Sequence, residues 1–281
     1  MLKQRVITAV VLLALLLPAL LVSQPWPFAL LTLVAIGAAG WEWARLNACG
    51  QPASIAFGIP MQFDKVYTEG ITKLTREDIR YAEELGYRIK LLGIAKRTPA
   101  GIELRVHPTL ISARRLIANV EGVMNAVVVK GDAVGATLYY GAGAGAEPTG
   151  SSVVADLVDV TRMHTADPRH RVPHLAFQPG LLSDTPVLPM DEVETSCYLR
   201  LRALDKPGVL ADITRILADL GISIEAMVQK EPSEGEAEVD IIMLTHSAKE
   251  KNVNAAIAKI RKLPQTTGRV TRIRLEHLSG K

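Results

Sequence analysis

Residues 196–229 read SCYLRLRALDKPGVLADITRILADLGISIEAMVQ, and this stretch decides the fold of the C-terminal part of the 281-residue chain. Residues 196–204 alternate apolar and polar side chains, as a half-buried strand does. Residues 207–220 place apolar side chains at helical spacing, and Gly221 follows as a helix-ending glycine. Residues 222–230 then predict a second strand.

The same kind of pattern continues to the end of the chain. Residues 237–246 are rich in branched apolar side chains and predict a third strand. Residues 247–263 predict a second helix and residues 269–278 a fourth strand. The resulting order, β-α-β-β-α-β, is that of the ferredoxin-like split arrangement.

Three short motifs in residues 195–278 resemble the ACT domain, a small-molecule regulatory module. They are Cys197-Tyr-Leu-Arg-Leu, Asp205-Lys-Pro-Gly-Val-Leu, and Gly221-Ile-Ser-Ile with Gln229 closing the second strand. The resemblance implies that two copies pair as an ACT-mediated homodimer and bind an amino acid between them, with threonine as the expected effector. Cys197 alternates into the strand and is interpreted as a small core residue rather than a nucleophile.

The turn from Asp205 to Gly208 is the candidate effector-binding element. A tight turn before a helix exposes N–H groups that can bind a carboxylate, although proline at the first helical position is common without any ligand. Asp205 is the nearest anion for the ammonium group of an amino acid. The predicted effector-binding residues are Asp205, Gly208, Val209, Leu210, Ile222, Ser223 and Ile224.

Residues 53–163 predict a small, mostly antiparallel sheet with helices. Thr75 followed by acidic residues predicts the start of an amphipathic helix that continues through Ile79 to Gly86. Residues 88–95 and 102–106 predict strands joined by a hairpin turn at residues 98–101. Residues 123–130 and 133–140 predict a second strand pair around a two-residue turn at 131–132.

A glycine-rich run, Gly141-Ala-Gly-Ala-Gly-Ala146, lies between a predicted strand and a helix expected over residues 149–162. It fits the G-x-G-x-x-A pattern, whose glycines let backbone N–H groups approach a pyrophosphate. A dinucleotide-binding unit also needs a second parallel strand that ends in an acidic residue about 20 positions on. Residues 164–189 offer proline and histidine instead, so a plain strand-to-helix turn capped by Thr149 is the alternative.

Residues 55–71 (IAFGIPMQFDKVYTEGI), 78–97 and 131–162 (GDAVGATLYYGAGAGAEPTGSSVVADLVDVTR) together resemble the carboxyl part of the homoserine dehydrogenase substrate domain. The resemblance implies NAD(P)-dependent interconversion of homoserine and aspartate semialdehyde, in threonine and methionine biosynthesis. It also implies that Gly141, Gly143, Ala144 and Gly145 line NADP or NAD.

The family's nucleotide-binding domain and catalytic lysine have no counterpart in the printed sequence. Trp41-Glu-Trp-Ala-Arg-Leu46 stands where acidic substrate ligands and the lysine would be expected. Holding cofactor and substrate in one geometry accounts for about 7–11 kcal/mol of such a barrier. No catalytic residue is therefore assigned, and the chain alone is expected neither to bind the cofactor nor to catalyse hydride transfer.

Residues 164–192 predict an extended linker. Three histidines there suggest a metal site, but five prolines preclude a helix that would fix their spacing, and no carboxylate pair accompanies them. No metal site is predicted.

Residues 6–41 carry no charged side chain, and Lys3, Arg5 and Arg45 flank them. This pattern predicts a transmembrane helical hairpin over residues 1–50 with residues 53–281 in the cytoplasm. A secretory signal peptide and a buried core hairpin are the alternatives.

The motifs KQRVITA (residues 3–9) and WEWARL (41–46) resemble the amino terminus of phosphatidate cytidylyltransferase, an integral membrane enzyme. The two resemblances imply that segments of two families are joined near residue 50 in a chimeric or truncated reading frame. If the N-terminal segment is an artefact of the reading frame, the protein is expected to be cytoplasmic.

The overall composition excludes some classes of function. The chain has 32 Lys+Arg against 29 Asp+Glu, and the two signs are interleaved, which argues against nucleic acid as a partner. Two cysteines cannot form a disulfide framework.

The expected fold is α+β: a membrane hairpin, a substrate-domain remnant over residues 53–163, a linker over 164–192 and an ACT domain over 193–281. The candidate functions are a truncated oxidoreductase, a membrane-tethered amino-acid sensor and a lipid-pathway membrane protein.

Overall fold

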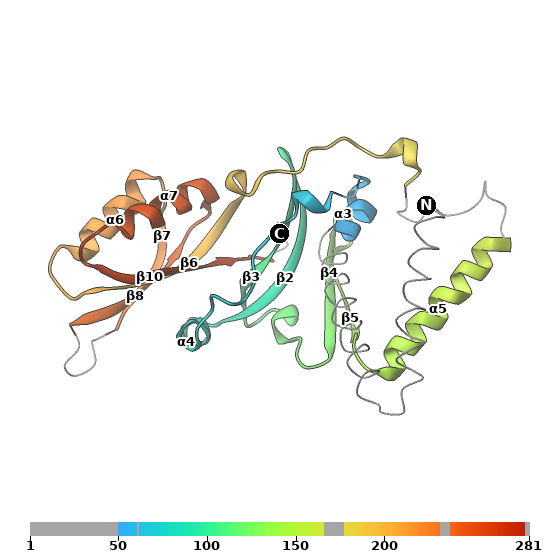
Figure 1. The fold of residues 1–281 in the computed structure, drawn as a ribbon, viewed down its shortest axis with the longest axis horizontal. Coiled ribbons are helices and arrows are strands. Elements are labelled where there is room, and N and C mark those ends of the chain that lie inside the picture. Colours follow the sequence, from blue (N-terminus) through green and yellow to red (C-terminus); the bar gives the residue numbers. More distant parts are fainter. Residues whose placement is uncertain (1–49, 61, 166–176, 231–236, 279–281) are drawn as a thin grey trace, which may run out of the picture.

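The computed structural model describes residues 50–60, 62–165, 177–230 and 237–278. Figure 1 shows the resulting chain path. The predicted membrane hairpin and the histidines at positions 170 and 174 lie outside the described residues. Among the helices that the structure does describe, none is both long enough and apolar enough to cross a membrane.

The C-terminal part has the predicted β-α-β-β-α-β order (Figure 1). Its elements are β6 (Glu194–Leu204), α6 (Val209–Asp219), β7 (Ile224–Gln229), β8 (Glu238–Thr245), α7 (Glu250–Ile260) and β10 (Thr266–Leu275), with a two-residue strand β9 (Ala248–Lys249) before α7. The strands lie in the order β10-β6-β8-β7, and every pair among these four is antiparallel. The ferredoxin-like prediction is confirmed.

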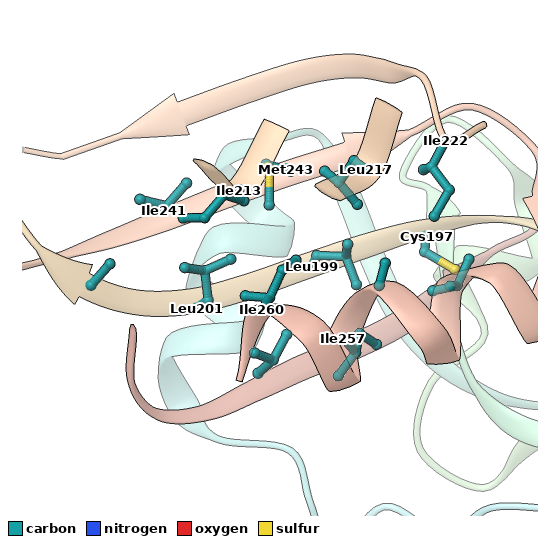
Figure 2. Close-up of a cluster of buried hydrophobic side chains, with 14 of the residues drawn as sticks. Cys197, Leu199, Leu201, Ile213, Leu217, Ile222, Ile241, Met243, Ile257 and Ile260 are labelled. Atoms are coloured by element: carbon teal, nitrogen blue, oxygen red, sulfur yellow. The ribbon is translucent and has the colours of Figure 1, made fainter. Parts of the chain in front are cut away.

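Both helices of this part cover one face of its sheet. Figure 2 shows the apolar side chains that meet there, including Leu199 and Leu201 of β6, Ile213 and Leu217 of α6, and Ile257 of α7. Cys197 belongs to this cluster and is fully buried, and burial raises the pKa of its thiol to about 11. As interpreted from the sequence, it is a core residue.

The N-terminal described part contributes a long hairpin and several short elements. They are α3 (Gly50–Phe57), the 3-10 turn η1 (Phe63–Lys65), β1 (Tyr67–Thr68), α4 (Arg76–Glu84), β2 (Tyr87–Thr98), β3 (Gly101–Ser112) and the 3-10 turn η2 (Leu116–Asn119). The hairpin turn at residues 98–101 is confirmed, with Thr98 opposite Gly101, but both strands are longer than predicted. The N-terminal cap of α4 is also confirmed, since Thr75 and Asp78 form a capping box.

The buried face of α4 differs from the predicted one. Tyr81 and Ala82 are buried, whereas Ile79 is 49% exposed. The face is set by Tyr81, whose ring packs on the sheet, rather than by the aliphatic side chain two positions before it. The amphipathic character of the helix is confirmed by Ala82 and Leu85, which contact the buried cluster, but Ile79 does not take part in it.

A second hairpin and a helix complete the described chain: β4 (Met124–Gly131), β5 (Gly135–Ala142) and α5 (Ala146–Thr165). The turn between the strands has three residues instead of the predicted two, because Gly131 pairs with Gly135. Gly135 has a φ of +73°, which glycine adopts readily. α5 begins at Ala146, so Thr149 lies inside its first turn and does not cap it.

The large sheet continues from the first part into the second without a break. β3 pairs in parallel with β10 through Thr109 opposite Arg274 and Leu110 opposite Leu275. The sheet therefore runs in the order β1-β3-β10-β6-β8-β7, and β2 pairs with β3. Separate modules joined by a linker were expected, whereas the structure shows one shared sheet.

The face of the C-terminal sheet opposite α6 and α7 is covered by α4. The apolar cluster on this face joins Tyr81 and Ala82 of α4 to Tyr198, Ile242, Leu244 and Ile273 of the sheet. Figure 1 places α4 on the other side of the sheet from α6 and α7. The described end of the predicted linker runs beside β3, where Leu188 N donates to Ile102 O at 2.8 Å.

Candidate functional site

The predicted effector turn lies between β6 and α6, at the end of the large sheet. Asp205 N donates to Ala237 O at 3.0 Å, which fixes the turn against the start of β8. Gly208 has a φ of +93°, a left-handed conformation that disfavours other residues, and α6 begins immediately after it. The first N–H groups of a helix have no carbonyl partner within the helix. The turn therefore presents backbone donors beside the exposed carboxylate of Asp205.

Gln229, at the C-terminal end of β7, completes this end of the sheet. Its Nε2 donates to Asp205 Oδ1 at 3.3 Å. This contact orients the carboxylate that would face an ammonium group. Gln229 was noted in the sequence as the residue that closes the second strand, but it was not predicted as a site residue. The only sequence signal for a contact with Asp205 was the position of Gln229 at the end of the second strand of the motif.

The remaining predicted effector residues do not meet this turn within one chain. Ile222, Ser223 and Ile224 follow the C-terminal end of α6, an 11-residue helix that spans about 16 Å. Ile222 is buried and its N–H donates to Leu217 O at 2.9 Å, while Ser223 O accepts from His246 N at 2.9 Å. One chain thus places the two groups at opposite ends of α6.

The glycine-rich run lies at the predicted place between a strand and a helix. Gly141 is in β5, Gly143 N donates to Val123 O at 3.1 Å, and Gly145 has a φ of +124° just before α5. Ala144 and its neighbours are exposed. The strand before the run pairs antiparallel with β4, so the described hairpin is not a parallel dinucleotide-binding unit.

The exposed side chain of Asn125 lies against Gly143. A Cβ atom built on it would lie 1.6 Å from Nδ2 of Asn125, whereas a Cβ built on Gly141 would meet nothing within 4 Å. The space that the missing side chain leaves is thus taken by Asn125 of β4. A nicotinamide cofactor would find the backbone accessible at Gly141. At Gly143, the side chain of Asn125 covers one side of the backbone.

Apolar side chains cover much of the surface around this run. On α5, Val153, Val154, Leu157 and Val160 are exposed, and on the hairpin Val127, Val129, Tyr139 and Tyr140 are exposed. Large apolar patches on a protein surface mark sites of interaction. Figure 1 shows α5 at the opposite end of the molecule from α6 and α7.

Two ion-pair networks connect the halves of the large sheet. In the first, Asp78 of α4 is fully buried and its Oδ1 accepts from Arg200 Nε at 2.6 Å. In the second, Arg274 of β10 donates to Glu69 at 2.9 Å and to Glu250 of α7 at 2.5 Å. Burial opposes ionisation of Glu69, but the hydrogen bond and charge of Arg274 hold its pKa below the ordinary value.

A further group of ion pairs lies along β3. Arg105 is buried between Glu103, at 3.0 Å, and Glu276, at 2.5 Å. His107 Nε2 lies 3.0 Å from Arg105 Nη1, and its Nδ1 lies 3.0 Å from Pro108 O. Because guanidinium can only donate, the neutral ring must accept at Nε2 and donate from Nδ1. Burial, together with the charge of Arg274, lowers the pKa of His107 to about 3.

No cluster of three or more potential metal ligands occurs among the described residues. The prominent polar features of this part of the chain are therefore the effector turn and the ion pairs of the large sheet.

Comparison with known proteins identifies both described parts. The family model described as homoserine dehydrogenase matches residues 52–158. The family model described as ACT domain matches residues 198–265. The two matches leave residues 1–51 uncovered.

Individual relatives give the same picture. The homoserine dehydrogenase of Pseudomonas aeruginosa is 62% identical over 227 residues, which are 81% of this chain and 52% of that protein. That of Neisseria gonorrhoeae is 55% identical over 226 residues, covering 80% of this chain and 52% of that protein. The crystal structure of a homoserine dehydrogenase from Thiobacillus denitrificans matches with a TM-score of 0.75 at 74% identity, covering 81% of this chain and 51% of that one. The chain thus spans about half the length of these relatives.

Proposed function

We propose that the described region is the effector-binding half of a homoserine dehydrogenase, because residues 52–158 match the homoserine dehydrogenase family model and residues 198–265 match the ACT domain model. The observation that carries the proposal is the turn from Asp205 to Gly208. It presents backbone donors at the start of α6 next to a carboxylate that Gln229 orients.

The proposed effector is an amino acid, with threonine as the first candidate. Its carboxylate would accept from N–H groups at the start of α6, where the helix dipole favours an anion. Its ammonium group would face Asp205. The start of β7 would contribute from a second copy, because one chain keeps Ile222–Ile224 at the far end of α6.

A homodimer is therefore part of the proposal. β7 pairs with β8 on one side only, and it ends the order of the large sheet. Met227 and Val228 on this strand are exposed. An exposed edge strand is a template for pairing with another chain. Light scattering after gel filtration should give the mass of a dimer, and a monomer both with and without threonine would contradict this part of the proposal.

A thermal-shift series tests the effector proposal on the full chain. Threonine should raise the melting temperature, while valine, which replaces the hydroxyl group by a methyl group, should raise it less. Asp205→Asn should weaken threonine binding about tenfold or more, since hydrogen bonds to charged groups contribute about 1.5–3 kcal/mol. Asp212→Asn, in the exposed first turn of α6, is the matched control and should leave the response unchanged. Equal shifts for Asp205→Asn and the wild type would refute the assigned site.

We further propose that homoserine and aspartate semialdehyde are interconverted only when a nucleotide-binding domain is joined to this half. NADPH or NADH would supply the hydride to aspartate semialdehyde, and NADP or NAD would accept it from homoserine in the reverse direction. Gly141 would lie on the cofactor side of the loop, because its backbone is open. The exposed apolar side chains of α5 and of the β4–β5 hairpin are suited to contact such a domain. Purified chain from a host lacking its own enzyme should not oxidise NADPH with aspartate semialdehyde, and substrate-dependent oxidation would overturn this proposal.

Membrane attachment is a separate proposal that rests on the charge-free residues 6–41. An expressed chain should stay in the membrane fraction after carbonate washing, with residues 53–281 protected from external protease in spheroplasts. Release by carbonate would overturn the attachment, and cleavage of residues 53–281 by external protease would overturn their cytoplasmic location.

A further inference from the structure

Asp78 performs two functions at once at the start of α4. Its Oδ2 accepts from the backbone N and from Oγ1 of Thr75, both at 3.0 Å, which completes the helix cap. Its Oδ1 accepts from Arg200 Nε at 2.6 Å and from the hydroxyl of Tyr198 at 3.4 Å. Two residues of the ACT strand β6 are therefore bound to the carboxylate that caps a helix of the other half.

Arg200 also reaches the other partner in this cap. Its Nη2 donates to Thr75 Oγ1 at 3.0 Å. The guanidinium thus bridges both members of the capping box. A displacement of β6 at Arg200 would change the bonds that define where α4 begins.

The C-terminal half of α4 contacts β8 and the end of β7. The hydroxyl of Tyr81 donates to Asp240 of β8 at 3.0 Å, and Lys230 Nζ pairs with Glu84 at 2.5 Å on the surface. An open cavity of about 120 Å³ lies here, lined by Tyr81, Glu84, Leu85, Val228 and Ile242. This open pocket lies beside the end of the helix that is farther from Asp78.

The same strands lead directly to the effector turn. Asp205 N is bound to Ala237 O, just before β8, and Asp240 lies opposite Arg202 of β6. Gln229, which binds Asp205, lies opposite Ile241 of β8. A ligand that reorders Asp205 and Gln229 therefore acts on the segment of β8 that binds Tyr81.

On its other side, α4 leads into the homoserine dehydrogenase-like half. Gly86, which follows the helix, accepts from Ala113 N at 2.9 Å through its carbonyl, and β2 begins at Tyr87. Tyr87 and Ile89 of β2 pack against the same apolar cluster as Tyr81. A shift of α4 would thus reach the long β2–β3 hairpin.

From these contacts we propose that α4 is the coupling helix of this protein: binding of an amino acid at the Asp205 turn tightens the Arg200–Asp78 and Asp240–Tyr81 contacts and so changes the position of the β2–β3 hairpin. This inference rests on the proposed effector function. It adds a regulatory role for Asp78, Tyr81 and Arg200, which touch no ligand and act through α4.

Hydrogen exchange followed by mass spectrometry on the full chain tests the coupling. Threonine should slow amide exchange in residues 76–84 of the wild type by about fivefold or more, the lower range of allosteric coupling. Arg200→Met should remove this response in α4 while leaving the threonine affinity within about twofold. Arg202→Met is the control, because Arg202 lies on the same strand, is exposed, and its Nε lies 3.1 Å from a carboxylate oxygen of Glu238 of β8. It should retain both the response and the affinity.

Tyr81→Phe provides a second, milder variant. It keeps the ring in the apolar cluster and removes only the hydrogen bond to Asp240. It should reduce the α4 response without loss of folding. If threonine binds the wild type but slows exchange only around residues 205–229, the coupling role of α4 is wrong and the proposed effector function stands. If threonine does not bind the wild type at all, both are wrong.

Discussion

Arg200 Nε lies 2.6 Å from Asp78 Oδ1, and this ion pair joins strand β6 to helix α4 across 122 positions of the sequence. Asp78 is fully buried, and Arg200 is largely buried. The pair lies where the ACT domain meets the homoserine dehydrogenase-like half. Together with the parallel pairing of β3 and β10, it makes the two halves one structural unit.

Removing the carboxylate of Asp78 should destabilise the protein strongly. Asp78→Ala leaves Arg200 without its buried counter-ion and opens the cap of α4, at an expected cost of about 3–5 kcal/mol. Asp78→Asn keeps an oxygen for the cap and should cost less. The free energy of unfolding in urea measures both changes. Glu77→Gln, in the same turn but exposed, should change it far less. An equal effect of Asp78→Ala and Glu77→Gln would contradict the assigned role.

Tyr81 should contribute mainly through its ring. Its side chain is buried against the ACT sheet, so Tyr81→Ala should reduce the free energy of unfolding by about 3–5 kcal/mol. Tyr81→Phe removes only the hydrogen bond to Asp240 and should cost about 1 kcal/mol. Thermal or urea unfolding of both variants separates the contribution of the ring from that of the hydroxyl hydrogen bond. Similar losses for the two variants would mean that α4 does not pack on the sheet as described.

His107 should make stability depend on pH between about 3 and 6.5. Burial and the charge of Arg274 lower its pKa to about 3, so the unfolded chain binds a proton in this range that the folded protein does not. Stability therefore falls as the pH decreases below 6.5, by up to about 1.4 kcal/mol per pH unit. His107→Gln should lose this contribution, so its free energy of unfolding should fall less between pH 6.5 and 4.5 than that of the wild type.

A matched substitution controls the pH experiment. His246→Gln changes an exposed histidine of the same protein and should leave the pH dependence of the wild type intact. Identical pH profiles for His107→Gln and the wild type would contradict a buried, neutral His107. The measurement requires urea unfolding curves at several pH values.

Gly143 should be required for packing rather than for backbone flexibility. Gly143→Ala places a methyl group against the exposed side chain of Asn125, which must rotate, so it should cost about 0.5–1.5 kcal/mol, as for a strained rotamer. In the Asn125→Ala background the same substitution should cost much less, because the obstructing side chain is gone. Gly141→Ala meets no atom and serves as the control. A cost of Gly143→Ala that is unchanged in the double variant would assign the glycine another role.

Local patterns predicted much of this fold. The order of strands and helices in the ACT domain follows from apolar periodicity, and the cap of α4 follows from Thr75 and Asp78 at the required spacing. The turn before β5 was predicted one residue too short, because Gly131 belongs to the strand and pairs with Gly135, which leaves residues 132–134 in the turn. Such shifts arise where two nearby glycines both permit the turn.

The pairing of β3 with β10 could not be read from the sequence. Alternation along a strand assigns its faces but does not choose its neighbours. Glu103, Arg105, His107 and Thr109 alternate in β3 and suggest a solvated face, yet all four are buried. Charges from the ACT half, such as Glu276, make that burial possible. In the candidate effector site, the turn at Asp205 was predicted, but its contact with Gln229 depends on the neighbouring strands.

The most direct test of the central claim is isothermal titration of the full chain with threonine. The account predicts saturable heat at up to millimolar threonine and weaker binding of valine. It predicts that Asp205→Asn lowers the threonine affinity about tenfold or more, whereas Asp212→Asn leaves it unchanged. A flat trace, or equal heats from threonine and valine, would contradict the claim that this ACT domain is a threonine-binding regulatory site.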